Sequence, residues 1–242
     1  MSKLNFSYLV SSDIGLRNDN QDFYYCDYPY RTGDKGSGIS SLSVIADGMG
    51  GLSHGREVAE IAVNSFIEYI FHQNFKDTVD SKLVLNYMDQ GFTLANEKVI
   101  QFAKKNNTKS GTTLTAALLI NDNLYITHVG DTRAYIFHNK KLFTGYSMSQ
   151  ITSDDHPPNN PFSLVNYIGD KNKELVTSRH EMKVKSGSLI ILTSDGFHGP
   201  VKNERFLKLV NKNKFELLPE SLIKEAKISG KDNITVAITK TD

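Results

Sequence analysis

The order of two hydrophobic periods along the chain limits the folds that are open to it. Apolar residues recur at three- and four-residue steps over 58–70 and 88–102, and such stripes predict helices that pack on a layer below them. Short β-rich runs stand before this helical pair, after it, and after a second pair near 203–212 and 219–228. This grouping favours layered sheets covered by helices over a doubly wound parallel sheet.

The remaining segments read as strands and one irregular stretch. Strands are expected at 5–12, 22–28, 41–46, 175–184, 188–193 and 233–239. The β-rich runs LTAALLIN, NLYITHVG and TRAYIFHN, which short polar turns divide, predict an antiparallel meander over 114–139. Prolines and asparagines between residues 145 and 172 predict an irregular loop or small flap. Without a repeat or a linker, we expect one domain over residues 1–242.

Composition excludes several classes of protein. The 242 residues are 39% hydrophobic and 23% charged, and the net charge of +1 gives no attraction to nucleic acid or to an anionic membrane. The chain opens on MSKLNFSYLV, which is no secretory leader, and no apolar run reaches the roughly 20 residues of a membrane span. The single cysteine, Cys26, cannot form an internal disulfide. We expect a cytoplasmic monomer.

The run VIADGMGG at 44–51 joins an apolar strand to a carboxylate and three glycines. A phosphate-cradling loop does not fit, because the Rossmann pattern that starts at Gly48 ends on Ser53 and no Gly-Lys-Ser/Thr follows. A plain turn stays open, since Asp-Gly is common in turns. The third reading is a metal site that uses the aspartate and a bare backbone carbonyl.

Acidic residues at other strand ends favour the metal site. In LIILTSDG an apolar run again leads to an aspartate and a glycine, here at Asp195. Asp22, Asp131 and Asp232 each adjoin a predicted strand. Five carboxylates gathered at one edge would repel one another unless cations neutralised them. All-oxygen ligands without a histidine or cysteine cluster select Mg²⁺ or Mn²⁺. A glycine at 48 would let its carbonyl approach such an ion closely, because it has no Cβ.

Six segments, in order, resemble the metal-dependent serine/threonine protein phosphatases of the PP2C (PPM) family in its compact bacterial form. They span residues 12–238 and read SDIGLRNDNQD, VIADGMGG followed by GREVA, SGTTLTAALL, VGDTRAY, LTSDGF and DNITVAI. The resemblance implies hydrolysis of phosphoserine and phosphothreonine in proteins by a water that two Mn²⁺ or Mg²⁺ ions activate. With the pattern of elements, it predicts an α+β fold: a four-layer α-β-β-α sandwich with two mainly antiparallel sheets between helical pairs.

The resemblance also implies a role for each matching residue. Asp47 would bridge the two ions, with the Gly48 carbonyl at the first and Asp195 and Asp232 at the second. Asp22 would hold metal-bound waters, and Asp131 with Asp195 would form a weaker third site. Arg17 matches the arginine that grips the substrate phosphate, which suits a permanently charged, planar guanidinium.

The chain departs from the family pattern at two positions near the site. Gln21 stands where relatives often have glutamate, so this position adds no charge to the metal site. Leu52 and Ser53 separate the glycine run from His54, which is the candidate general acid; the other reading is a solvated histidine at the start of a helix. His156 and His198 are expected to be structural or exposed, because no metal-ligand spacing links them.

Other readings differ in chemistry or in activity. A cysteine phosphatase is excluded, because four residues rather than five separate Cys26 from Arg31. A catalytically inactive phosphoprotein-binding module and a small-molecule phosphate monoesterase remain as alternatives. A phosphorylated protein substrate and an opposing serine/threonine kinase are the expected partners.

Overall fold

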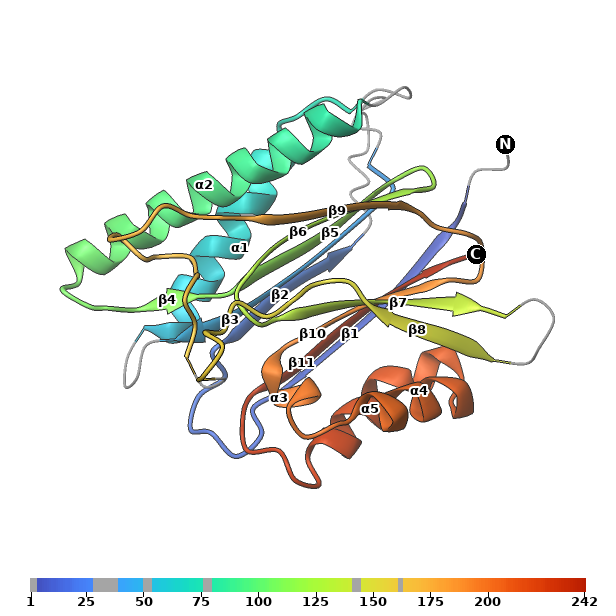
Figure 1. Cartoon of the computed structure of the whole chain (residues 1–242). Helices are drawn as coiled ribbons and strands as arrows, with labels where there is room; N and C mark the ends of the chain where they lie inside the picture. Colours follow the sequence, from blue (N-terminus) through green and yellow to red (C-terminus); the bar gives the residue numbers. More distant parts are fainter. Residues whose placement is uncertain (1–3, 28–38, 50–53, 76–79, 141–144, 161–162) are drawn as a thin grey trace.

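The computed structural model describes residues 4–27, 39–49, 54–75, 80–140, 145–160 and 163–242 (Figure 1). Within these ranges the strands form two sheets, and every strand pairing in them is antiparallel. The first sheet has the order β1 (Phe6–Asp13), β11 (Ile234–Thr241), β10 (Leu189–Thr193), β7 (Arg133–Asn139) and β8 (Tyr146–Gln150). The second has the order β2 (Asp22–Asp27), β3 (Ser41–Met49), β5 (Leu114–Ile120), β6 (Asn123–Val129) and β9 (Ser178–Lys183), with β4 (Gly111–Thr112) beside β3.

Helices cover the outer face of each sheet (Figure 1). The β2–β9 sheet carries α1 (Gly55–Phe71) and α2 (Ser81–Lys105). The other sheet carries α3 (Asp195–His198), α4 (Asn203–Lys212), the 3-10 turn η1 (Phe215–Leu217) and α5 (Leu218–Ala226). The α+β four-layer sandwich that the sequence predicts is therefore confirmed.

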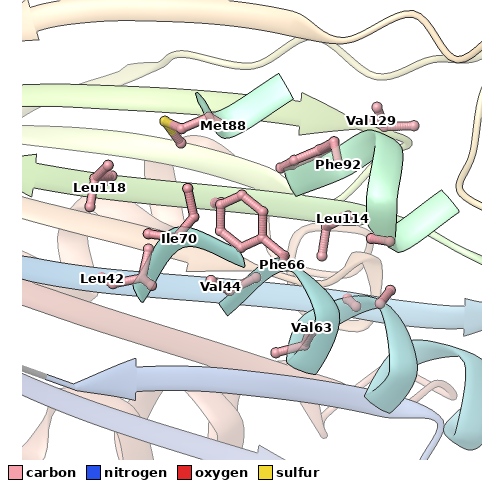
Figure 2. Close-up of a cluster of buried hydrophobic side chains, with 14 of the residues drawn as sticks. Leu42, Val44, Val63, Phe66, Ile70, Met88, Phe92, Leu114, Leu118 and Val129 are labelled. Carbon is pink, nitrogen blue, oxygen red and sulfur yellow. The ribbon is translucent and has the colours of Figure 1, made fainter. Parts of the chain in front are cut away.

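Three hydrophobic clusters lie between the four layers, one at each interface. Figure 2 shows the first, where Phe66 and Ile70 of α1 and Met88 and Phe92 of α2 pack above Leu42 and Val44 of β3 and Leu114 and Leu118 of β5. These helical residues belong to the predicted stripes. The Asp80 side chain caps α2 by accepting a hydrogen bond from the Lys82 amide at 3.0 Å, a contact typically worth about 1 kcal/mol.

The predicted meander over 114–139 is wrong in its last strand. β5 and β6 form a hairpin, but β7 crosses to the other sheet and pairs with β10. The chain makes the crossing at Gly130, whose φ of +105° suits glycine, and Asp131 follows it. Local periodicity identifies a strand but not its partner, and β6 and β7 are both largely buried, so alternation gave no sign of the change of sheet.

The irregular segment expected at 145–172 begins and ends about five residues later than predicted. Its expected start belongs to β8, an edge strand that pairs with β7. Residues 151–160 and 163–177 then contain neither helix nor strand beyond one bridge, in which Thr112 and Ile168 exchange two backbone hydrogen bonds of 2.9 Å. This bridge joins the segment to β4, whose Thr112 also binds the backbone of Asp47.

Candidate metal centre

Five aspartates from separate segments share one electrostatic environment. Asp22 opens β2 and lies directly opposite Asp47 of β3 in the strand register. Asp195 begins α3 after β10, Asp232 precedes β11, and Asp131 lies in the crossing between the sheets. Burial raises the pKa of Asp47 well above its ordinary value, and the charges of the other four aspartates raise it further. The structure therefore brings together all five predicted carboxylates.

Asp22 is the most enclosed of the five, with 3% of its surface exposed. One oxygen, Oδ2, accepts hydrogen bonds from Ser194 Oγ at 2.8 Å and Thr235 Oγ1 at 2.6 Å. The other, Oδ1, is buried without a hydrogen-bond partner. Burial raises the pKa of Asp22 to about 7, although both hydroxyl bonds oppose that shift. The carboxyl group therefore retains its proton far more readily than an exposed aspartate does.

Burial also raises the pKa values of Asp195 and Asp131. Burial and then the charge of Asp232 raise the pKa of Asp195, while a hydrogen bond with Asp47 lowers it. Asp195 Oδ1 is buried without a hydrogen-bond partner. Burial, with a contribution from Asp195, raises the pKa of Asp131 to about 6. Buried acceptors that lack donors and repel one another are stabilised by cations.

These residues fit hard divalent cations by their chemistry. The atoms that could bind an ion are carboxylate oxygens, two of which are buried without hydrogen-bond partners, and the cluster concentrates negative charge. No group of three His, Cys, Asp or Glu side chains in the described part of the chain stands ready to hold an ion as arranged. Asp232 Oδ2 instead binds Arg17 at 2.6 Å, and ligation of an ion by Asp232 would have to replace this ion pair.

The backbone around Asp47 is fixed by threonines that sequence reasoning did not single out. The Asp47 amide donates to Thr113 Oγ1 at 2.8 Å, and the Asp47 carbonyl accepts from the Thr113 amide at 3.0 Å and Thr112 Oγ1 at 2.9 Å. At Gly48 a Cβ would lie 2.0 Å from the Gly55 carbonyl oxygen. Close approach of the start of α1 therefore requires glycine at 48, whether or not its carbonyl binds an ion.

Arg17 lies at the exposed side of the carboxylate cluster. Its Nη2 is 2.6 Å from Asp232 Oδ2, with the two side chains 58% and 37% exposed. Asp232, then Asp195 and Asp47, raise the pKa of Arg17, so the guanidinium lies within the field of three predicted metal ligands. This position agrees with the predicted role of Arg17 in binding a phosphate.

His54 has side-chain contacts with one residue of α1 and one of α2. It precedes α1 with a left-handed φ of 74°, its Nδ1 is 3.6 Å from Glu57 Oε1, and its ring packs edge-on against Phe102. The contacts agree with the reading of His54 as a histidine at the start of a helix, and its role as general acid stays a prediction.

Two histidines that the sequence assigned to structural or exposed positions contact Asp131. His156 Nε2 is 3.5 Å from Asp131 Oδ2, and His198 Nε2 donates to the Asp131 carbonyl at 3.0 Å. Burial lowers the pKa of His198 to about 4, so its ring is neutral at pH 7. Beside them Arg133 grips Asp154 through two bonds of 2.8 and 2.7 Å. In the sequence, His156 directly follows Asp154 and Asp155.

Comparison with known proteins gives matches over nearly the whole chain. The family model described as protein phosphatase 2C matches residues 18–225. The protein phosphatase PhpP of Streptococcus pneumoniae is 25% identical over 248 residues, which cover 94% of each protein. The serine/threonine phosphatase stp of Listeria monocytogenes is 25% identical over 222 residues, covering 83% of this chain and 84% of that protein.

Solved structures share the fold at lower identity. Stp1 from Staphylococcus aureus superimposes with a TM-score of 0.82 at 20% identity, covering 100% of this chain and 98% of that one. The catalytic domain of PstP, solved in complex with two manganese ions, gives a TM-score of 0.79 at 23% identity, with 98% and 99% covered. Because the family model matches most of the chain, the chain belongs to the protein phosphatase 2C family.

Proposed function

We propose that this chain hydrolyses phosphoserine and phosphothreonine in proteins with the help of two divalent cations, Mn²⁺ or Mg²⁺. The observation that carries the proposal is the group of five buried or half-buried aspartates, two with orphaned oxygens, beside an exposed arginine. Membership of the family supports the reaction type. The two manganese ions named for PstP support the number of ions.

Each aspartate has a distinct task in this proposal. Asp47 would contribute to both ions and the Gly48 carbonyl would contribute to the first, while Asp195 and Asp232 would hold the second. Asp22 would hold water molecules near the ions, and Asp131 with Asp195 would support a weaker third site. When bound, a pair of ions lowers the pKa of a water to near neutrality and makes it available for attack.

Arg17 binds and orients the substrate phosphate. A guanidinium donates two parallel hydrogen bonds to phosphate oxygens and keeps its charge throughout the reaction. In the structure Arg17 forms an exposed ion pair with Asp232. Such pairs stabilise a protein by only about 0–1 kcal/mol, so exchange of this contact for a phosphate costs little. The leaving serine or threonine oxygen needs a proton, and His54 is the candidate donor.

The substrate is a phosphorylated protein, and the opposing activity is that of a serine/threonine kinase. The serine/threonine phosphatases among the relatives support this class of substrate. The chain acts as a single catalytic domain and as a monomer. In the ranges that the structure describes, no helix has the length and apolar character required to cross a membrane.

A single assay tests the proposal. Phosphate release from a phosphothreonine peptide is measured with Mn²⁺, with Mg²⁺, and with EDTA. Release that depends on the cation is expected, and the EDTA sample should show none. No release under any condition would favour a phosphoprotein-binding module, and release from small phosphate esters without release from the peptide would favour a small-molecule monoesterase.

A further inference from the structure

Asn233 lies between a predicted metal ligand and the loop that carries Arg17. It directly follows Asp232, it is 4% exposed, and its carboxamide faces residues 14–21. Asn233 Oδ1 accepts from the Gln21 amide at 2.9 Å. Asn233 Nδ2 donates to the carbonyls of Ile14 and Asp19, both at 2.9 Å. One buried side chain therefore binds both ends of the loop that presents Arg17.

The backbone at this point has little freedom to move. The Asn233 amide donates to Asp232 Oδ1 at 2.9 Å, so Asn233 also orients that carboxylate. A Cβ at Gly15 would lie 2.0 Å from the Asp232 carbonyl oxygen, and one at Gly196 would lie 1.9 Å from the Asn233 carbonyl oxygen. The chain at 232–233 is thus enclosed between the Arg17 loop and the start of α3, and both neighbours need glycine.

Other contacts of the loop lead to other elements. The Gly15 amide donates to Asp13 Oδ1 at 2.8 Å and Asn20 Nδ2 donates to Ser12 Oγ at 2.9 Å, which joins the loop to β1. Arg56 Nη1 of α1 donates to the Asn20 carbonyl at 3.0 Å, and the Gly48 amide of β3 donates to the Gln21 carbonyl at 3.1 Å. Asn233 joins the loop to the strand that follows Asp232, and therefore fixes Arg17 relative to the metal centre.

We infer that Asn233 is a positioning residue, which holds the loop of Arg17 so that the guanidinium stays beside Asp232, where it would bind the substrate phosphate. The inference rests on the proposed function and adds to it a residue that acts through Arg17. Loss of the Asn233 carboxamide should free the loop, weaken phosphate binding and leave ion binding nearly unchanged, since the amide that orients Asp232 belongs to the backbone.

A double-mutant cycle between Asn233→Ala and Arg17→Ala separates positioning from a general loss of structure. Residues that act through one another give non-additive effects, so kcat/KM on a phosphothreonine peptide should fall about tenfold for Asn233→Ala in the wild-type background but less than about twofold in the Arg17→Ala background. The fall should lie mainly in KM. Asn233→Ser, a smaller change, repeats the cycle if Asn233→Ala does not fold.

Two readouts do not depend on activity. Hydrogen exchange at the Gln21 amide should become faster in Asn233→Ala, because its acceptor is lost. Mn²⁺ affinity by titration calorimetry should stay within about threefold of wild type, since no predicted ligand is removed. Asn213→Ala is the matched control, because Asn213 makes comparable bonds to Leu209 and Ser221 far along the chain from Arg17, and kcat/KM should not change.

The outcomes are distinct. Equal losses of kcat/KM in both backgrounds, or no loss in either, would overturn the positioning role while leaving the proposed function intact. A wild-type protein that releases no phosphate with Mn²⁺ would overturn the proposed function, and this inference with it.

Discussion

Replacement of Asp22 by asparagine should remove a pH-dependent loss of stability that this carboxyl group causes. Asp22 is 3% exposed, and burial raises its pKa from an ordinary 3.8 to about 7. This difference spans about three pH units, and at about 1.4 kcal/mol for each unit it corresponds to about 4 kcal/mol. Because asparagine does not titrate, the variant should lack this contribution.

The direction in which stability changes with pH follows from the number of protons that the folded and unfolded chains bind. Between about pH 4 and pH 7 the unfolded chain releases the Asp22 proton while the folded chain retains it, so the free energy of unfolding falls as the pH rises through this window. The asparagine amide oxygen can still accept the bonds from Ser194 and Thr235, so the variant loses little else.

Urea unfolding at pH 4.5, 6.0 and 7.5 in the presence of EDTA measures this difference. Wild type should lose about 3 kcal/mol of stability relative to Asp22→Asn between pH 4.5 and pH 7.5. Asp122→Asn, which weakens an exposed ion pair with Lys183, should follow wild type at each pH. The reasoning is refuted if Asp22→Asn and wild type change in parallel, or if wild type becomes more stable relative to the variant as the pH rises.

Three further predictions concern the proposed centre. Asp47→Asn should abolish phosphate release in excess Mn²⁺ while circular dichroism shows an intact fold; turnover of p-nitrophenyl phosphate at the wild-type rate would refute the role of Asp47. Arg17→Ala should raise the KM for a phosphothreonine peptide by about tenfold or more, as loss of a charged hydrogen bond predicts, and change Mn²⁺ affinity less; the reverse order would refute phosphate binding by Arg17. Mn²⁺ at about 100 times its Kd should raise the free energy of unfolding by about 2.7 kcal/mol, and an unchanged urea midpoint would contradict specific binding.

The helical layers could be predicted because their periodicity is local. The stripe that includes Phe66 and Ile70 and the one that includes Met88 and Phe92 both face the predicted layer below. The partner of β7 could not be predicted, since strand pairing depends on distant segments that a local pattern does not reveal. The edge strand β8 was missed because it lies in a stretch otherwise rich in prolines and asparagines.

Some residues of the candidate site could likewise be predicted from the sequence, and others could not. Asp47 and Asp195 could be found because each follows an apolar strand and precedes glycine, and in the structure each affects the pKa of the other. The supporting residues Thr113 and Asn233 could not be found from spacing alone, because their side chains bind backbone groups far away in the sequence. His156 was assigned to a structural or exposed position, and its contact with Asp131 depends on a loop whose path the sequence does not determine.

The most direct test of the central claim is the number of Mn²⁺ ions that the protein binds, measured by titration calorimetry on wild type and on Asp47→Asn. If these aspartates form a two-ion centre, wild type should bind at least two ions and the variant should lose the pair together, because Asp47 is shared by both. Binding of no ion by wild type, or full binding of two ions by Asp47→Asn, would contradict the account.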